Sequence, residues 1–406
     1  MEQVFLAKKK IFLWCLYDFA NSIVFANFLL YFPQWLVIDG GLSNFWYNAT
    51  FAISTILLFF TAPVLAAYTD KSGHRKFWLN VSTVGLAFSY TMSVICAMNG
   101  LSIFLVTLFF LLGQYFYQLS FVFYNPMIDE LSDISRRGRI SGIGQFSNAI
   151  GQVIGLAIML PLAYSRLAPL LPSIAIFFLL ALPLMIFYKE TPKTTKHNKE
   201  TVKAKIEFSS FYKNLIPFFS VSIATPLLLA FFFYNDALVT VTNNYSIYMQ
   251  EVFIISDDKK SLVLMLIVVM NAVGALLSGW IGDKIGLKKT LQIVLWLWIF
   301  ALPLIAVLSH LIVFIVITAF LGILIGAMWA ISRAYMSSLL TKDNMGFGFS
   351  FYTVLERFAT FIGPLTWGGV IAMLGANATT YRIAMATMTV FVVIGLIIIT
   401  FWKKKN

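Results

Sequence analysis

Two acidic residues lie inside apolar stretches, where an ionised side chain is costly. Asp18 interrupts the apolar run IFLWCLYDFANSIVF at residues 11–25, and Asp236 interrupts a second run, FFFYNDALVT, at residues 231–240. An ionisable group at membrane depth costs about 2.5–3.5 kcal/mol on insertion scales, so it marks a site that binds a solute, carries a proton or pairs with another group. A buried carboxyl can also take up and release a proton when its surroundings change. These two positions are therefore the first candidates for chemistry.

Polar neighbours accompany each aspartate at a similar place in its run. A single residue of this kind serves helix packing about as often as function, because hydroxyl and amide groups hydrogen-bond adjacent helices. Two such groups at matching positions favour function. The first group is Tyr17, Asp18, Asn21 and Ser22, and the second is Tyr234, Asn235, Asp236 and Thr240.

Other apolar stretches carry amides and charges of their own. Residues spaced three or four apart share one face of a helix, and an uncharged stripe of this kind more often joins helices than binds a ligand. Unpaired charges would be costlier, so Arg333 and Glu356 are expected either to form an internal salt bridge or to meet a solute. The candidates are Gln114 and Gln118 in one stripe, Asn148 between Gln145 and Gln152 in another, and Arg333 and Glu356 among the charged residues.

The elements that carry these residues are long apolar segments. The chain has 406 residues, of which 60% are hydrophobic and 11% charged, whereas soluble domains carry about 25% charged residues. Runs of about 20 apolar residues, enough to cross a hydrocarbon core of about 30 Å, recur along the chain. We predict an all-α integral membrane protein with twelve spanning helices. The predicted spans are residues 11–37, 45–68, 77–98, 102–127, 140–163, 168–188, 223–249, 261–282, 289–308, 311–338, 346–373 and 380–402.

These spans divide into two sets of six. Residues 1–188 and 223–406 are predicted to form two pseudo-symmetric six-helix bundles, and the polar, basic segment 189–222 is predicted to be a cytoplasmic linker. Residues 211–224 are expected to form an interfacial helix before the seventh span, the alternative being that they belong to that span.

Basic residues are concentrated in alternate loops. The net charge is +12, and most of the 29 Lys and Arg fall on one side of the predicted spans. Such an excess marks cytoplasmic loops. We therefore predict cytoplasmic termini and expect no nucleic-acid partner. The predicted location is a bacterial inner or plasma membrane. The cations on the opposite side are Arg166, Lys259, Lys260 and Arg382.

A loop motif recurs at the same place in each half, after the second and eighth spans. A small residue allows neighbouring helices to approach closely, an Asp can interact with a helix N-terminus, a Gly supplies a turn, and basic residues follow. The first copy contains Asp70, Lys71, Gly73 and Arg75, and the second contains Gly279, Asp283, Lys284, Gly286 and Lys288.

This pattern resembles the major facilitator superfamily, whose signature loop between helices 2 and 3 has this form and recurs between helices 8 and 9. The resemblance implies two six-helix bundles that work by alternating access, and a gating role for both loops. The segments YDFANS and YNDALVT, with Ser332–Tyr335 and residues 346–364, resemble the branch of vacuolar autophagy-related amino-acid effluxers and their bacterial relatives. This second resemblance implies outward movement of amino acids or similar metabolites.

The sequence contains no Walker loop, nucleophile–base pair or cluster with metal-ligand spacing. No cofactor, metal site or enzymatic activity is therefore expected. We predict a secondary active transporter, acting as a monomer, that moves a small polar solute. Its other expected partners are membrane lipid and protons, the latter through Asp18, Asp236 or Glu356. The alternatives are a proton-coupled multidrug or toxic-metabolite exporter and, more remotely, a channel or a membrane-embedded enzyme.

Overall fold

The computed structural model describes residues 2–72, 74–131, 137–190, 224–340, 352, 355–356 and 358–402. Residues 2–7, 63, 67, 70–72, 129, 137–139 and 141–142 are described by their backbone alone. The predicted linker 189–222 and interfacial helix 211–224 lie almost wholly outside the described residues.

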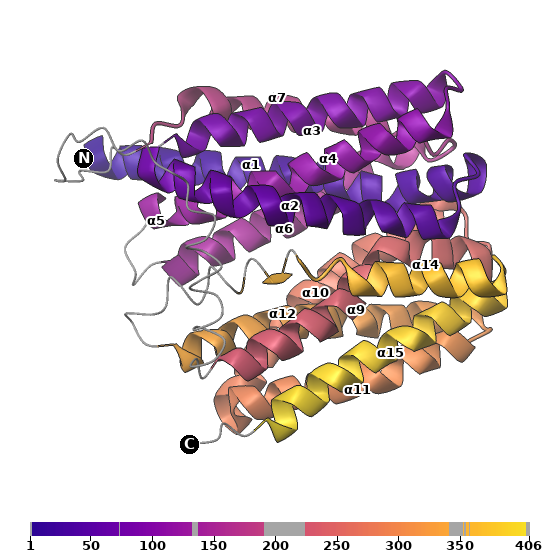
Figure 1. The fold of residues 1–406 in the computed structure, drawn as a ribbon. Helices are drawn as coiled ribbons and strands as arrows, with labels where there is room; N and C mark the ends of the chain where they lie inside the picture. The colour runs from indigo at the N-terminus through magenta and orange to yellow at the C-terminus, as the bar shows by residue number, and fades with distance from the viewer. Residues whose placement is uncertain are drawn as a thin grey trace. The chain divides into compact units, whose positions relative to one another are not determined.

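Helices account for most of the described chain (Figure 1). Eleven of these described helices are long and apolar enough to cross a membrane, as the hydropathy of the sequence predicts. They are α1 (Glu2–Gln34, continued by the π-helical η1, Trp35–Asp39), α2 (Asn44–Ser72), α3 (Arg75–Met98), α4 (Ile103–Tyr124), α6 (Arg137–Met159), α7 (Leu170–Phe187), α9 (Thr225–Phe253), α10 (Asp257–Ile285), α11 (Leu287–Val307), α12 (Leu311–Leu339) and α15 (Ala378–Phe401).

The remaining predicted span, residues 346–373, is met by the shorter helix α14 (Ile362–Leu374). The backbone bends at residues 359–361, so a helical segment starts anew within this span. Residues 341–351 lie outside the described part. Short helical turns follow α4 and α6. They are η2 (Asn125–Met127), α5 (Ile128–Leu131) and η4 (Leu160–Leu162).

The chain forms two compact units whose boundaries fall inside helices. Unit 1 comprises Met1–Asn27, Ile56–Met159 and Leu167–Pro217, and unit 2 comprises Phe28–Thr55, Leu160–Arg166 and Phe218–Asn406. α1 and α2 therefore each pass from one unit into the other. The predicted halves 1–188 and 223–406 follow the sequence repeat and stay a prediction.

In unit 1, α6 packs on α1 through glycines. A Cβ added at Gly151 would lie 2.4 Å from the carbonyl oxygen of Phe19, and one added at Gly155 would lie 2.9 Å from the Cα of Ile23. Small residues are what allow two membrane helices to approach at backbone distance. This approach brings short polar side chains of α1 and α6 within hydrogen-bonding reach.

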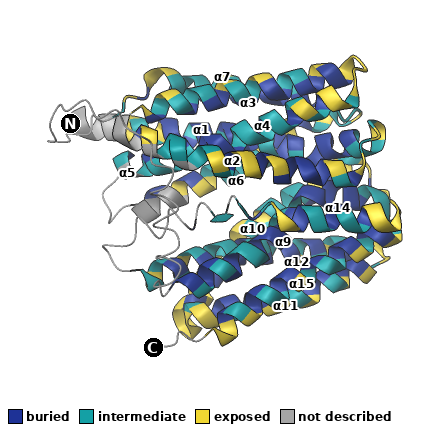
Figure 2. Ribbon diagram, in the orientation of Figure 1, coloured by how far each residue is buried: buried dark blue, intermediate teal, exposed yellow. Residues whose placement is uncertain are grey.

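In unit 2, α10 and α12 meet in the same way. A Cβ at Gly274 would lie 1.9 Å from the carbonyl oxygen of Ile323, and one at Gly326 would lie 1.8 Å from that of Asn271. In the most apolar 18-residue stretch of α9, 67% of the residues are buried, whereas in that of α10 the share is 17%. α9 is therefore a central helix and α10 a peripheral one. Figure 2 marks the buried positions of each unit in dark blue.

Candidate functional site

In unit 1, Asp18 is held by a chain of amide groups. Its side chain is buried on α1, with 5% exposed, and it accepts a hydrogen bond from Nδ2 of Asn148 at 3.0 Å. Gln152 in turn donates from Nε2 to Oδ1 of Asn148 at 2.7 Å. Both amides stand on α6, which Gly151 brings against α1. The predicted stripe on α6 and the predicted acid on α1 therefore form one polar group, which we name the Asp18 group (Asp18, Asn148 and Gln152).

Aromatic residues fix the rotation of α1 beside this group. The rings of Trp14 and Tyr124 stack at 4.8 Å, Nε1 of Trp14 donates to the Tyr124 carbonyl at 3.3 Å, and the Tyr124 hydroxyl donates to the Trp14 carbonyl at 3.0 Å. The hydroxyl of Tyr17 lies 2.8 Å from that of Thr83 on α3. Tyr17 therefore anchors α1 to α3.

Asn21 has a different environment from its neighbours. It is 1% exposed, and neither its amide nitrogen nor its amide oxygen has a hydrogen-bond partner among the described residues. Buried polar atoms are nearly always bonded, so an unpaired amide indicates a place where a water or solute bonds. Ser22 donates back to the carbonyl of Asp18 within α1 at 2.7 Å.

Of the amides on α4, Gln118 is buried and Gln114 is half-buried.

In unit 2, Asp236 of α9 is fully buried beside the start of α14. Its Oδ2 accepts a hydrogen bond from the backbone N–H of Gly363 at 2.6 Å, in the first turn of α14. The first amides of a helix have no partner within it, and they favour negative charge. Asp236 therefore caps α14 from α9. Oδ1 of Asp236 and the hydroxyl of Thr240 have no hydrogen-bond partner in the described part of the chain.

The neighbours of Asp236 join α9 to α12 and to Glu356, which precedes the bend at residues 359–361. The hydroxyls of Tyr234 and Ser332 lie 2.7 Å apart. Asn235 accepts from Nε1 of Trp329 at 3.0 Å and donates to the backbone carbonyl of Glu356 at 3.4 Å. The second candidate group thus consists largely of contacts between helices.

Arg333 and Glu356 are both half-buried. The ion pairs among the described residues do not include one between them. The alternative, that Arg333 or Glu356 contacts a solute, stays a prediction.

The two loop motifs are only partly described. Arg75 begins α3 and is buried; it donates to the carbonyl of Pro126 at 3.3 Å and forms an ion pair with the carboxylate of Glu130 at 3.7 Å. It thereby ties α3 to the turns after α4. Asp70 and Lys71 lie in the last turns of α2 with no described side chain, and Gly73 is outside the described residues.

The second motif follows the sequence reasoning at one glycine and departs from it at another. Gly286 ends α10 with φ of 93°, which only a glycine adopts readily. Gly279 does not serve helix approach, because a Cβ there would meet nothing within 4 Å. Nζ of Lys284 lies 3.5 Å from the centre of the Trp280 ring, and Asp283 and Lys288 are exposed.

The burial of Lys260 was not predicted from the sequence. The charge pattern groups it with the loop cations, whereas α10 starts at Asp257 and the Lys260 side chain is 0% exposed. Its Nζ donates to Gln34, to Gln250 at 2.5 Å and to Asp257 at 2.7 Å. The i, i+3 spacing of Asp257 and Lys260 is the one signal in the sequence that could have shown a pair.

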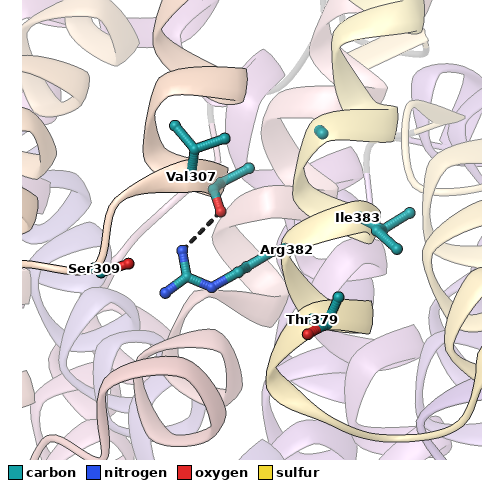
Figure 3. A pocket seen from close by; sticks show the side chains of 7 residues that line it. Val307, Ser309, Thr379, Arg382 and Ile383 are labelled. Carbon is teal, nitrogen blue, oxygen red and sulfur yellow. Dashed lines mark hydrogen bonds between the residues drawn. The ribbon is translucent and has the colours of Figure 1, made fainter.

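A shallow pocket of about 410 Å³ lies between α11 and α15 (Figure 3). Arg382 lines it and donates to the carbonyl of Ala306 at 2.8 Å and to that of Leu308. Its guanidinium thus satisfies carbonyls at the C-terminus of α11, a structural role. The sequence pattern groups Arg382 with the loop cations. None of the predicted site residues lines this pocket.

Comparison with known proteins identifies the family. The model of the Major Facilitator Superfamily matches residues 14–243 and 227–406. An MFS-type transporter of Bacillus subtilis (strain 168), YxiO, is 24% identical over 417 residues, covering 96% of this chain and 93% of the relative. A protein of Aquifex aeolicus (strain VF5) is 25% identical over 385 residues, covering 92% and 93%.

Solved structures share the fold at low identity. A point mutant of the nucleoside transporter NupG is similar with a TM-score of 0.75 and 13% identity, covering 96% of this chain and 98% of that one. An inward-facing, unoccupied bacterial homologue of the human lysosomal transporter Spinster gives 0.71 and 15%, covering 98% and 96%. A D-xylose–proton symporter gives 0.71 and 16%, covering 99% and 98%. With the family model matched along nearly its whole length, the chain belongs to the major facilitator superfamily and is an integral, multi-pass membrane transporter.

Proposed function

We propose that this transporter moves a small polar solute by alternating access, and that Asp18 couples the movement to protons. The observation that carries the proposal is the Asp18 group, where a buried carboxylate meets side-chain amides beside the unpartnered amide of Asn21. Side-chain donors can exchange one partner for another without unfolding a helix. A solute with both donors and acceptors could therefore bond there in their place.

Asp236 is the weaker candidate for coupling. Its carboxylate bonds the backbone at the start of α14, so losing its charge would weaken a helix end as well as any solute contact. We assign Asp236 a positioning role. Glu356 contributes its backbone carbonyl to Asn235, and its carboxylate remains the third candidate.

The solute class is proposed from two directions. The resemblance of YDFANS and YNDALVT to the amino-acid effluxer branch supports an amino acid or similar metabolite, moved outward. The similar structures include a nucleoside transporter and a D-xylose–proton symporter, which supports a small polar solute more broadly. The predicted loops at Arg75 and Gly286 are proposed to gate the cytoplasmic side, where both termini are proposed to lie.

The test has two stages. Purified protein is first screened by thermal shift against amino acids, peptides, nucleosides and sugars, and a stabilising compound identifies the solute class. Stabilisation by apolar toxins alone would instead support the multidrug exporter.

Transport of that compound is then measured in proteoliposomes with an imposed pH gradient. Asp18→Asn is expected to reduce gradient-driven transport to the background level, whereas Asp258→Asn, the same change at an exposed aspartate, should leave it unchanged. Gradient-driven transport that persists in folded Asp18→Asn protein contradicts the coupling role.

A further inference from the structure

A buried charge cluster joins distant parts of unit 2. We name it the Lys260 cluster, after the ammonium at its centre. Two cations and two carboxylates balance within it, and two amides complete its hydrogen bonds. Its members are Gln34, Asp39, Arg166, Gln250, Asp257 and Lys260.

The bonding of Lys260 is complete. Its ammonium has three N–H donors, and three acceptors on α1, α9 and α10 receive them, namely Gln34, Gln250 and Asp257. An ammonium removed from water is tolerated only when it is paired and fully hydrogen-bonded. The position is therefore built for a charge that stays buried while these helix ends remain together.

Arg166 extends the cluster to η1, which continues α1. Its Nε donates to Oδ2 of Asp257 at 3.2 Å, and its Nη1 donates to Oδ1 of Asp39 at 2.7 Å. Asp257 therefore bridges both cations. The Asp39 side chain is 43% exposed, so the cluster runs from the surface to a fully buried centre.

A second polar layer lies on α1, α9 and α10 and also includes α2. The amides of Asn48 and Asn244 bond each other reciprocally, at 3.1 and 2.8 Å. The hydroxyl of Ser246 donates to the carbonyl of Leu29 at 3.2 Å, and the hydroxyls of Tyr31 and Ser261 lie 2.8 Å apart. Both layers join the end of α1 that belongs to unit 2 to α9 and α10, and the second layer also joins α2 to α9 through Asn48 and Asn244.

The Lys260 cluster and the second layer form a polar seam between helix ends. Opening a polar seam has a different effect on free energy from opening an apolar one. Apolar surfaces lose their hydrophobic stabilisation when water enters, whereas charged and amide groups exchange protein partners for water. The closed and open states of a polar seam can therefore lie close in free energy, as a switching element requires.

We propose that the Lys260 cluster is a latch that holds together the ends of α1, α9 and α10 opposite the basic loops, and that it opens once per transport cycle. These ends are the ones predicted to be extracellular. The latch rests on the alternating access proposed above.

The test measures access of water-soluble reagent to a buried reporter. Cys15 and Cys96, the two cysteines of the chain, are replaced by Ala, and Ser246→Cys supplies the reporter, at a position 2% exposed. Labelling by a charged maleimide is followed in purified protein, so that the result does not depend on membrane orientation. Size-exclusion elution and thermal unfolding establish that each variant is folded.

Lys260→Gln is expected to raise the labelling rate roughly tenfold, equivalent to about 1.4 kcal/mol in the opening equilibrium. The matched control is Lys259→Gln, the same change at an exposed neighbour, which should leave the rate unchanged. Equal rates in these two folded variants overturn the latch. If Lys260→Gln does not fold, Arg166→Gln replaces it in the same comparison.

The outcomes separate the latch from the proposed function. Faster labelling in Lys260→Gln together with proton-driven transport in Asp18→Asn would retain the latch and reject Asp18 as the coupling residue. Unchanged labelling together with loss of transport in Asp18→Asn would do the reverse.

Discussion

Asp18 and Asp236 stand at matching places in the first helix of each half, yet their carboxylates have different kinds of partner. Asp18 accepts from the side chain of Asn148, on a helix that continues past it. Asp236 accepts from the backbone amide of Gly363, where α14 begins. An uninterrupted helix uses its own amides, so it can meet an acid only with side chains. A helix that starts beside an acid offers free amides instead.

This difference shows that a repeated sequence position does not fix a role. The partner helix decides it, because a side-chain amide can leave the carboxylate at little cost while a helix N-terminus cannot. We therefore propose that Asp236 is committed to structure and that Asp18 can exchange the side-chain amide of Asn148 for another donor.

The largest difference is expected between the transport activities of Asp18→Asn and Asp236→Asn. Asp236→Asn retains an oxygen that can accept from Gly363, so we expect pH-gradient-driven transport to persist at a reduced rate. Asp18→Asn should fall to background in the same proteoliposome assay. Equal loss in both variants would mean that the two acids act alike and would remove the comparison.

Alanine substitution of the two close glycines should have the next largest effect. A Cβ at Gly151 would press on backbone of α1, with 2.4 Å to the Phe19 oxygen, whereas at Gly363 the nearest atom, at 2.3 Å, is the hydroxyl of Thr240. Overpacking of this kind costs about 1–3 kcal/mol. Gly363→Ala should therefore regain part of its thermal stability when combined with Thr240→Ala, although the backbone oxygen of Asp236 would still lie at 3.0 Å. No single side-chain deletion relieves Gly151→Ala.

Gly279→Ala is the matched control for both, since a Cβ there meets nothing within 4 Å. Its unfolding temperature should stay at or above that of the unchanged protein. A loss as large as that of Gly151→Ala would show that helical glycine itself, rather than close approach, is what matters.

For stability the order of the two acids should be the reverse: alanine should cost more at Asp236 than at Asp18. Asp236→Ala removes the cap of α14, and loss of a cap costs about 0.5–2 kcal/mol. Asp18→Ala should cost less, because the Nδ2 of Asn148 that loses its acceptor belongs to a half-buried residue and can bond water instead. Thermal unfolding of the purified variants measures both, and a lower stability of Asp18→Ala would contradict the capping role of Asp236.

The smallest effects are expected at the paired tyrosines. Tyr17→Phe loses one hydroxyl contact to Thr83, and Tyr234→Phe loses one to Ser332. A hydrogen bond contributes about 0.5–1.5 kcal/mol net, so both variants should unfold slightly earlier and still transport. Abolished transport in Tyr17→Phe alone would move that hydroxyl from anchoring α1 into the solute site.

The fold was largely predictable because the membrane imposes long apolar runs. The first predicted span, residues 11–37, corresponds to Lys8–Asp39, and the last, residues 380–402, corresponds to Ala378–Phe401. The predicted span 346–373 differs because α14 starts only at Ile362. Pro364, in the first turn of that helix, was the sequence signal for such a start.

The site was predictable only in part. An acid in an apolar run marks Asp18 and Asp236, but their partners come from helices far along the chain, and hydropathy carries no information about which helix is adjacent. Lys260 shows the same limit. It follows Asp257, Asp258 and Lys259 and has the pattern of a loop charge, whereas two of the acceptors that make its burial possible, Gln34 and Gln250, stand on other helices.

α1 carries both Asp18 and Gln34, and it passes from unit 1 to unit 2 between them without interruption. One continuous helix thus links the proposed solute group with the proposed latch. Thermodynamic reciprocity then applies: by whatever factor a bound solute shifts the latch toward its open form, the open latch changes the affinity for that solute by the same factor. Titrations of solute binding in Lys260→Gln would therefore report the coupling of the two sites as a change in dissociation constant, with no transport measurement needed.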